Sequence, residues 1–408
     1  MKLFSLFNKK VFHIEPGLER IKAACEFIGN PEKNFRSVLI SGTNGKGSTA
    51  SFLESLFRHH GLKTGLFTSP HLIKENERWQ INRKEIHDRT LEEYIYELKP
   101  VIERFNLTYF EASTLLAFKY FSDEHVDIAV LEVGLGGKWD STNVVNPEIS
   151  IITNVSLDHT HLLGNSTEEI AEEKLGIARK DKPLIIGSEQ MEIISKAILK
   201  GIREIYHYPI GFSYKKKAFN RFDYFFKGKK LKNLEISLLG GRQISNASTA
   251  LTGFFVYSDK KGINVEENKI REALKNAKWK GRMEIVSQKP LIIVDGAHNE
   301  DAIIKTLKEI EEIFPNKKLI TVYSGMKDKD WKKILNIISY KSKKVLTAEM
   351  SVSRGIKAEE FEKEGYETYK NVNEAIKKAV YLSDENSVIL ITGSLYFVGE
   401  ALSSIVIK

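Results

Sequence analysis

Residues 41–49, with the sequence SGTNGKGST, decide the fold of this chain. They follow a short apolar run at 38–40 and precede a stretch whose apolar residues at 52, 53, 56 and 57 fall on one helical face before Gly61. A strand, a glycine-rich loop and a helix therefore come in the order typical of phosphate-binding loops. We expect the inward-turned N–H groups of the loop and the N-terminus of the helix to bind phosphate oxygens.

The side chains of the loop suggest divided roles. We expect Lys46 to reach the β and γ phosphates of ATP and Ser48 or Thr49 to face magnesium. The usual spacing places the hydroxyl residue directly after the lysine, so the inserted Gly47 is a departure. The alternative is a glycine-rich turn that binds nothing, and the flanking strand and helix argue against it. The candidate ATP-binding residues of the loop are Asn44, Gly45, Lys46, Gly47, Ser48 and Thr49.

Apolar runs alternate with longer amphipathic stretches on both sides of a central segment. In the first part the runs lie at 38–40, 65–67, 128–131 and 149–152. After residue 285 they resume at 291–294, 319–323, 344–347 and 388–391, each separated by one helical pattern. This alternation predicts buried strands of an α/β fold. We place the boundary between two domains near residues 279–284.

The central segment, about residues 205–240, has a different pattern. Apolar residues at 222, 224 and 226 alternate with polar ones up to Lys227-Gly228, and those at 234, 236 and 238 alternate afterwards. This predicts a hairpin. Lysines interleave with the aromatics, as on a single-strand nucleic-acid surface, but period-2 alternation explains the aromatics as one buried face. We expect no nucleic-acid partner.

The composition of the chain indicates the class of protein and the compartment in which we expect it. Its 408 residues include 42% hydrophobic and 28% charged residues, a globular balance without a membrane-spanning run. Cys25 is the only cysteine, which fits a reducing compartment and a small buried side chain. The net charge of +8 suits anionic ligands, although the lysines and arginines are spread along the chain. The N-terminal stretch MKLFSLFNKKVFH is too short and interrupted for a signal peptide, so we expect a cytoplasmic protein without a membrane partner.

Further blocks in the sequence point to one family. GTNGKGST is followed by TSPHL at 68–72, TYFE at 108–111, LEVGLGG at 131–137, LDH at 157–159, EKLG at 173–176, QISNA at 243–247, WKGRME at 279–284, DGAHN at 295–299 and ITGSLY at 391–396. In this order they resemble the signature of folylpolyglutamate synthase and the bifunctional dihydrofolate synthases, members of the Mur ligase superfamily. The resemblance runs from residue 17 to residue 396, nearly the whole chain.

The resemblance implies both a fold and a reaction. The fold is a P-loop ATPase domain with a parallel-rich sheet at 1–280 and a smaller, Rossmann-like glutamate-ligase domain at 281–408, with the active site between them. The family phosphorylates a folate carboxylate with ATP, and the amine of L-glutamate then displaces phosphate. The resemblance thus implies ATP and two magnesium ions as cofactors, and tetrahydrofolate, dihydropteroate and glutamate as substrates. We expect a monomer.

Polar residues at strand ends are candidate metal ligands. Glu132 ends the run at 128–131 and meets a glycine-rich turn, and Asp158 and His159 follow the run at 149–152. The carboxyl ends of parallel strands are where open sheets bind ligands. The resemblance makes Glu132, His159 and Ser69 ligands of magnesium. A histidine is an unusual ligand for this ion, which prefers oxygen.

Lys174 lies within an apolar stripe. Ser166 and Glu169 suggest a capping box, and Ile170, Lys174 and Ile177 then share a helical face. One interpretation is a lysine whose stem packs inward while its ammonium reaches water. The resemblance supplies another, because the matching lysine of the family is carbamylated and takes part in catalysis together with Lys46.

Further roles come only from the resemblance. Asn246 is expected at the base of ATP, Arg282 at phosphate and Asp295 near the ribose. His298, a catalytic candidate, and Ser394 match positions near glutamate, although residues 392–394 could equally form only a turn.

The pterin-binding positions include one departure from the family. Thr108, Trp139, Asp140 and Ser141 match segments that contact the pterin, but position 139 normally carries a smaller apolar residue. An indole there could stack on a pterin or narrow the pocket. Elsewhere, Arg242 stands where the family often has histidine.

Two other functions remain open from sequence. Another Mur-type amino-acid ligase would keep the ATP site and change the carboxylate acceptor. A P-loop ATPase without ligase chemistry would lack nucleotide contacts on a second domain.

Overall fold

A computed structural model describes the chain except residues 1, 8–12, 14 and 407–408. Part of the N-terminal stretch considered above as a signal peptide lies outside the described residues. The chain divides into two compact units. Unit 1 comprises Met1–Ser237 and Gln243–Lys278, and unit 2 comprises Leu238–Arg242 and Trp279–Lys408.

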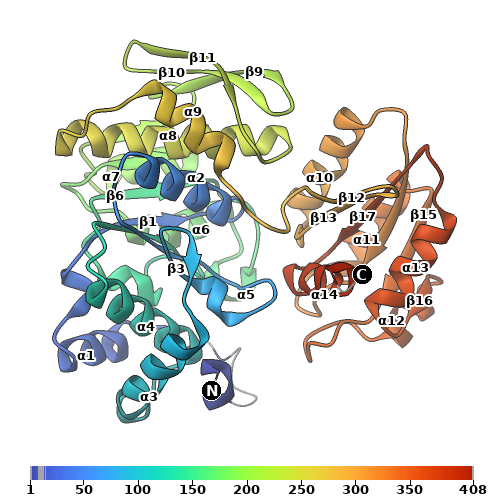
Figure 1. Ribbon diagram of the computed structural model, residues 1–408, viewed down its shortest axis with the longest axis horizontal. Helices are drawn as coiled ribbons and strands as arrows, with labels where there is room; N and C mark the ends of the chain where they lie inside the picture. Colours follow the sequence, from blue (N-terminus) through green and yellow to red (C-terminus); the bar gives the residue numbers. More distant parts are fainter. Residues whose placement is uncertain (1, 8–12, 14, 407–408) are drawn as a thin grey trace. The chain divides into compact units, whose positions relative to one another are not determined.

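The main sheet of unit 1 has eight strands in the order β4-β3-β2-β5-β1-β6-β7-β8 (Figure 1). Neighbouring strands pair in parallel along the series β2-β5-β1-β6-β7-β8. At the other edge, β3 pairs antiparallel with both β2 and β4. Their bounds are β1 Arg36–Ser41, β2 Thr64–Phe67, β3 Trp79–Ile81, β4 Lys84–Glu85, β5 Ile128–Glu132, β6 Ile149–Ile152, β7 Leu184–Ile186 and β8 Ile205–His207. The four strands predicted for this part of the chain are confirmed, whereas the patterns did not indicate the short β3, β4, β7 and β8.

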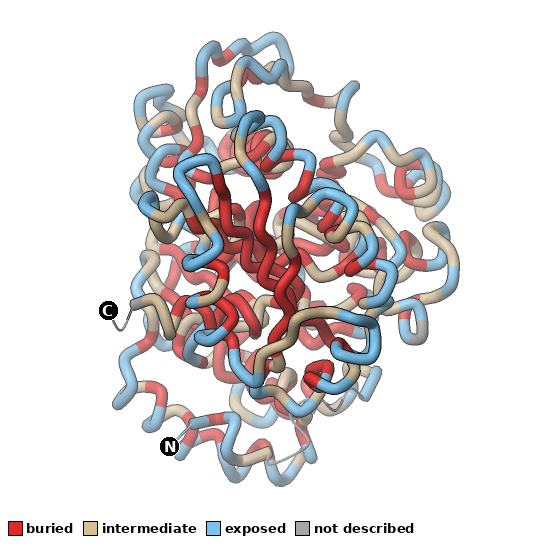
Figure 2. The backbone as a smooth tube through the Cα atoms, turned by 90° about the vertical axis from the view of Figure 1, so that its right-hand side faces the viewer, coloured by how far each residue is buried: buried red, intermediate tan, exposed pale blue. Residues whose placement is uncertain are grey.

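Helices cover both faces of this sheet. Helices α1, α3 and α4 lie on the opposite side of β1 from α2, α8 and α9 (Figure 1). The helix bounds are α1 Glu19–Phe27, α2 Lys46–His59, α3 Asp88–Arg104, α4 Tyr109–Asp123, α5 Thr160–Leu163, α6 Thr167–Lys174, α7 Met191–Leu199, α8 Gly241–Lys261 and α9 Glu267–Asn276. Single 3-10 turns lie at η1 Leu3–Leu6, η3 Pro31–Lys33, η4 Glu75–Arg78, η5 Ser141–Val144 and η6 Leu175–Ile177. Strands β5 and β6 of this sheet are buried along their whole length. In the backbone tube of Figure 2, stretches of buried residues (red) alternate with exposed turns (pale blue). Cys25 is buried, as predicted.

The predicted hairpin is part of a three-stranded antiparallel sheet. Strands β10 Arg221–Phe226 and β11 Lys229–Glu235 form the hairpin, and β9 Ser213–Ala218 adds a strand that was not predicted. Tyr224 and Phe226 are buried and their rings stack on Phe255 of α8. The alternating aromatics therefore form one buried face.

Unit 2 is a second α/β layer structure. Its sheet has the order β12-β13-β17-β14-β15-β16, parallel except for the edge strand β12. The strands are β12 Glu284–Gln288, β13 Leu291–Asp295, β14 Lys318–Tyr323, β15 Lys344–Ala348, β16 Glu367–Tyr369 and β17 Ser387–Thr392, and the helices are α10 Glu300–Ile313, α11 Trp331–Lys341, α12 Ala358–Lys363, α13 Val372–Leu382 and α14 Leu395–Val406. All four strands predicted for this unit are present, but β12 and β16 were not predicted, and β15 and β17 are separated by α12, β16 and α13 instead of by one helix. The α/β fold class, with a parallel-rich sheet and a separate C-terminal sheet, is confirmed.

Among the described residues, no helix combines the length and the apolar character that crossing a membrane requires.

Candidate nucleotide and metal site

The phosphate loop connects β1 to α2, as predicted. Gly45 is the N-cap of α2 and has a left-handed backbone with φ +86°. Gly42 has φ +147°, and a Cβ added there would lie 1.8 Å from Thr153 Oγ1. Both positions thus require glycine, for their backbone angles and for close packing. The first N–H groups of α2 have no intrahelical acceptor, so this end of the helix can bind an anion.

Two side chains of the loop have the positions expected for phosphate and metal chemistry. Lys46 Nζ donates to the carbonyls of Gly42 and Thr43 at 3.0 and 3.3 Å, which holds the ammonium over the loop. Thr49 Oγ1 is buried and has no hydrogen-bond partner among the described residues, while Ser48 is 2% exposed. A buried hydroxyl without a partner is destabilising, so a bound ligand is a reasonable partner for it. The Thr49 hydroxyl could coordinate a metal ion through its oxygen or donate a hydrogen bond to a phosphate.

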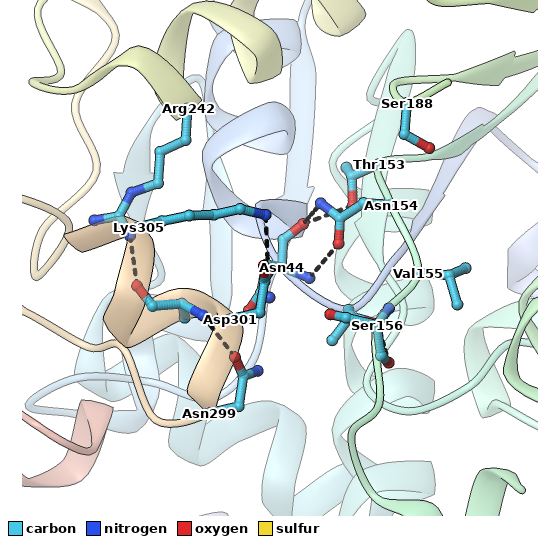
Figure 3. Close-up of polar contacts among 12 residues, drawn as sticks. Asn44, Thr153, Asn154, Val155, Ser156, Ser188, Arg242, Asn299, Asp301 and Lys305 are labelled. Atoms are coloured by element: carbon cyan, nitrogen blue, oxygen red, sulfur yellow. Dashed lines mark hydrogen bonds and ion pairs between the residues drawn. The ribbon is translucent and has the colours of Figure 1, made fainter. Parts of the chain in front are cut away.

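The segment that follows β6 makes hydrogen bonds to the phosphate loop (Figure 3). The N–H of Asn44 donates to Asn154 Oδ1 at 3.1 Å, and its carbonyl accepts from Asn154 Nδ2 at 2.9 Å and Thr153 Oγ1 at 2.7 Å. Thr43 Oγ1 accepts from the Ser156 N–H at 3.0 Å and donates to the Ser156 carbonyl at 3.1 Å. The loop after β1 and the segment after β6, which follow adjacent strands, are therefore joined by several hydrogen bonds.

Asn246 of α8 lies against the loop. A Cβ on Gly45 would be 2.4 Å from Asn246 Oδ1, and Asn246 Nδ2 donates to Gln243 Oε1 at 3.0 Å. The residue predicted to bind the base of ATP is therefore next to the phosphate loop in unit 1.

Glu132 and Ser69 meet at the carboxyl edge of the sheet. Glu132 ends β5 and is 5% exposed, and its Oε2 accepts from the Ser69 N–H at 3.1 Å. His159 has a left-handed backbone before α5, and its Nε2 is 3.9 Å from Asp158 Oδ1. Among the described residues, no three His, Cys, Asp or Glu side chains gather closely enough to hold a metal alone. A metal here would therefore need hydroxyl and phosphate oxygens as well, as magnesium commonly does.

Lys174 is buried at the end of α6, with 3% exposure. The interpretation that its ammonium reaches water is therefore wrong. Its pKa is lowered to about 7, mainly by burial and in addition by the charge of Lys46, while Asp158 and Glu173 oppose the shift. The helix ends at this residue, so Ile177 lies in the following 3-10 turn instead of on the same helical face.

The start of α6 also differs in detail from the prediction. The Ser166 hydroxyl accepts from the Glu169 N–H at 3.2 Å, but the Glu169 carboxylate accepts from the Asn165 N–H instead of returning to Ser166. Only half of the capping box forms.

The glycine-rich turn after β5 contacts both the end of β1 and the end of α6. Its Gly136 carbonyl accepts from Ser41 Oγ at 2.6 Å, and the N–H of Lys138 donates to the Glu173 carbonyl at 2.9 Å. A Cβ on Gly137 would lie 2.9 Å from the Lys174 carbonyl. The ends of β1, β5 and α6 therefore meet.

Of the predicted pterin-binding residues, Trp139 is the exposed one. Its indole is 46% exposed, with Lys138 Nζ 4.9 Å from the ring centre. Asp140 is buried and accepts from the N–H groups of Leu135 and Thr142, each at 3.0 Å. Burial raises the pKa of the Asp140 carboxyl, and these hydrogen bonds oppose the shift.

The other two predicted pterin-binding residues have local partners. Ser141 Oγ and Thr114 Oγ1 are 2.6 Å apart. Thr108 caps α4 by accepting from the Glu111 N–H at 3.3 Å.

In unit 2, Asp295 is fully buried and bonded on both oxygens. Its Oδ2 accepts from Arg242 Nη2 at 2.6 Å and the Met283 N–H at 2.8 Å, and its Oδ1 accepts from the Ala297 N–H and Thr306 Oγ1 at 3.0 and 3.1 Å. The observed contacts of Asp295 hold the end of β13 together; the ribose contact expected from the resemblance stays a prediction. Sequence reasoning gave Arg242 no role.

The remaining predicted residues of unit 2 lie at the carboxyl ends of β13 and β17. His298 Nδ1 is 2.9 Å from the Gly296 carbonyl, and Ser394 Oγ accepts from the Tyr396 N–H at 3.2 Å at the start of α14. A Cβ on Gly296 would lie 3.1 Å from Arg282 Nη1. The N–H of Gly393 donates to the Ala297 carbonyl at 3.0 Å, which joins the two strand ends.

Sequence matching to known families agrees with this geometry. Residues 40–253 match the Mur ligase middle domain, and residues 281–395 match the Mur ligase glutamate ligase domain. The dihydrofolate synthase/folylpolyglutamate synthase of Bacillus subtilis is 31% identical over an alignment of 409 positions that covers 95% of this chain and 95% of that protein. The Escherichia coli protein of the same description is 33% identical over 78% of this chain and 74% of its own.

Solved structures are similar over the whole chain. FolC of E. coli in complex with DHPP and ADP has a TM-score of 0.91 and 29% identity, covering 100% of this chain and 98% of that chain. A bifunctional folylpolyglutamate synthase/dihydrofolate synthase with Mn, AMPPNP and L-glutamate bound has a TM-score of 0.89 and 28% identity, covering 99% and 98%. The chain therefore belongs to the dihydrofolate synthase/folylpolyglutamate synthase family of Mur ligases and is an ATP-dependent ligase that joins glutamate to folate.

Proposed function

We propose that the chain activates the folate carboxylate as an acyl phosphate and acts on both tetrahydrofolate and dihydropteroate. A carboxylate oxygen attacks the γ phosphorus of ATP, and the bond to ADP breaks. The glutamate amine then attacks the acyl carbon, phosphate leaves, and the amine loses a proton to water. The observation that carries this proposal is the meeting of the phosphate loop, the Ser69–Glu132 pair and buried Lys174 at one edge of the sheet of unit 1.

The phosphate loop supplies the charge that phosphoryl transfer requires. The N–H groups at the start of α2 bind phosphate oxygens, and Lys46 offsets the negative charge that develops on the transferred group. Fixed donors of this kind commonly contribute several kcal/mol, about 3 to 4 for one donor, because they need no reorganisation. Asn246, which lies beside Gly45, and Arg282 are proposed as further nucleotide contacts.

Magnesium fits the oxygen donors of this edge. Thr49 Oγ1, buried without a partner among the described residues, and the carboxylate of Glu132 would hold it, with Ser69 and His159 as further ligands and two ions in the complete site. When bound, the metal would neutralise charge on the phosphates. A relative with bound Mn and AMPPNP supports a divalent ion with nucleotide.

Lys174 is proposed to carry a carbamate. With a pKa of about 7, much of its amine is neutral and nucleophilic near neutral pH. The amine nitrogen attacks the carbon of CO₂ and loses a proton to water, which leaves a carbamate anion. An anion near Lys46 removes the repulsion between two ammonium groups and would attract metal ions.

Substrate binding completes the proposal. The exposed indole of Trp139 offers a flat surface for a pterin ring. Thr108, Asp140 and Ser141, each held by a local hydrogen bond, are proposed to contact the pterin as well. In unit 2, His298 and Ser394 are proposed to bind glutamate. We propose a cytoplasmic monomer that needs no nucleic acid or membrane.

Phosphate release under four conditions tests the reaction. With ATP and magnesium, we expect rapid release only when a pteroyl substrate and glutamate are both present, because the acyl phosphate needs a carboxylate to form and an amine to resolve. Release at the same rate without either substrate would indicate a plain ATPase. Activity with tetrahydrofolate but not with dihydropteroate would restrict the proposal to the first substrate.

Carbamylation needs its own measurement. Carbon-13 bicarbonate should produce a carbamate signal in the wild type that is absent from Lys174→Ala. An equal signal in both proteins would contradict modification of this residue.

A further inference from the structure

The backbone of Asn44, in the phosphate loop, is bonded by side chains on both its N–H and its carbonyl. Asn154 makes one bond to each group, at 3.1 and 2.9 Å, and Thr153 adds a second donor to the carbonyl at 2.7 Å (Figure 3). The carbonyl of Asn154 also accepts from the Thr43 N–H at 3.0 Å. Adjacent residues of the segment after β6 therefore bind adjacent residues of the phosphate loop.

The chemistry of the Asn154 side chain matches this arrangement. An amide offers one acceptor oxygen and one donor nitrogen, so it can satisfy an N–H and a carbonyl of the same residue at once. Aspartate offers only acceptors, and an apolar side chain offers neither. The orientation of the amide is fixed because one of its partners is a donor and the other an acceptor.

The hydrogen bonds from Asn154 and Thr153 fix the orientation of the peptide groups on either side of Asn44. Because the carbonyl of Asn44 accepts from Asn154 and Thr153, its oxygen is directed towards the segment after β6. If the peptide turned over, the carbonyl could point towards the phosphates, and like partial charges would repel. Gly45, which follows directly, has a left-handed backbone and no side chain of its own to restrain it.

We propose that Asn154 is a positioning residue for the nucleotide, acting through the Asn44 peptide, with Thr153 as its partner. This inference rests on the proposed binding of the ATP phosphates by the loop. A positioning role can be told apart from a purely structural one. Loss of a positioning residue weakens the binding of the ligand's phosphates more than the binding of its base, and more than it lowers the stability of the fold.

Calorimetric titration with adenosine and ADP separates these roles in the full-length protein. We expect Asn154→Ala to weaken ADP binding about tenfold to a hundredfold, the range for losing two hydrogen bonds at a charged site. Adenosine affinity should change less than about twofold, since that ligand lacks phosphate. Asn34→Ala is the control, because its amide donates to Ser122 Oγ at 2.8 Å, outside the phosphate loop.

A second pair of variants covers the case in which Asn154→Ala does not fold. Thr153→Val keeps the shape of the side chain and removes one donor, whereas Thr153→Ser keeps the donor. We expect weaker ADP binding in Thr153→Val alone. Unchanged ADP affinity in Asn154→Ala, an equal loss for adenosine and ADP, or equal behaviour of the Thr153 pair would overturn the inference. A wild type that binds no ADP would instead refute the proposed nucleotide role of the loop.

Discussion

Replacing Lys174 by methionine should stabilise the fold while it abolishes turnover. The side chain is 3% exposed, and burial is the largest cause of its low pKa. Methionine has a similar length and no charge to bury, so it removes the desolvation penalty. It also removes the amine on which a carbamate would form. Opposite effects on stability and activity are typical of residues kept for function.

The size of the effect follows from the pKa. The pKa of the amine falls from 10.5 to about 7 on folding, and about 1.4 kcal/mol per pKa unit gives a penalty of about 4 to 5 kcal/mol. Below pH 7 both states are protonated and the penalty is complete. Between pH 7 and 10.5 the unfolded chain holds a proton that the folded chain has lost, so wild-type stability rises with pH and the advantage of methionine fades.

Urea unfolding in CO₂-free buffer at pH 7 and pH 10 measures this advantage, since without CO₂ no carbamate forms. Tryptophan fluorescence is a suitable signal, because Trp79 is fully buried in unit 1. The control is Lys22→Met, which replaces an exposed lysine of α1 and should change stability by less than about 0.5 kcal/mol at both pH values. Equal stability of Lys174→Met and wild type at pH 7, or a difference that does not shrink at pH 10, would refute this reasoning.

Three further substitutions test other parts of the site. Lys46→Ala should lower turnover by about a hundredfold or more, measured at saturating ATP, with little change in melting temperature; near-normal turnover would show that the loop does not contact the reacting phosphates. Gly45→Ala should weaken ADP binding in a titration, because its Cβ would lie 2.4 Å from Asn246 Oδ1 in a left-handed backbone, and unchanged affinity would mean that the loop moves freely. Arg242→Met should destabilise unit 2 by about 3 to 5 kcal/mol in calorimetry, because it leaves buried Asp295 without its cation, and a stable variant would show that water replaces the guanidinium.

Sequence patterns predicted the strands that are long and buried on both faces. Strand β1 and its parallel neighbours β5 and β6 give continuous apolar runs because helices cover both faces of the sheet. Strands β7 and β8 have only three residues each, too few for a period to appear. Strand β9 has the sequence SYKKKA and is held by pairing with β10 more than by burial, so its pattern is that of a polar loop.

The site was predictable where a local motif carries the chemistry. The phosphate loop and the strand-end Glu132 follow from residues next to one another in the sequence. Lys174 showed the limit of this approach, because the helical pattern placed it on an apolar face without showing whether the ammonium reached water. That depends on the turn after β5 and on Lys46, which are distant in sequence. Asn154 was missed for the same reason, since its partner Asn44 is 110 residues away.

Product mass is the most direct test of the ligase activity. Purified protein is incubated with ATP, magnesium and L-glutamate, and with either tetrahydrofolate or dihydropteroate, and the products are identified by mass spectrometry. We expect each pteroyl substrate to gain one glutamyl residue, with one ADP and one phosphate formed for each amide bond. ATP hydrolysis without any glutamylated product from either substrate would contradict the assignment.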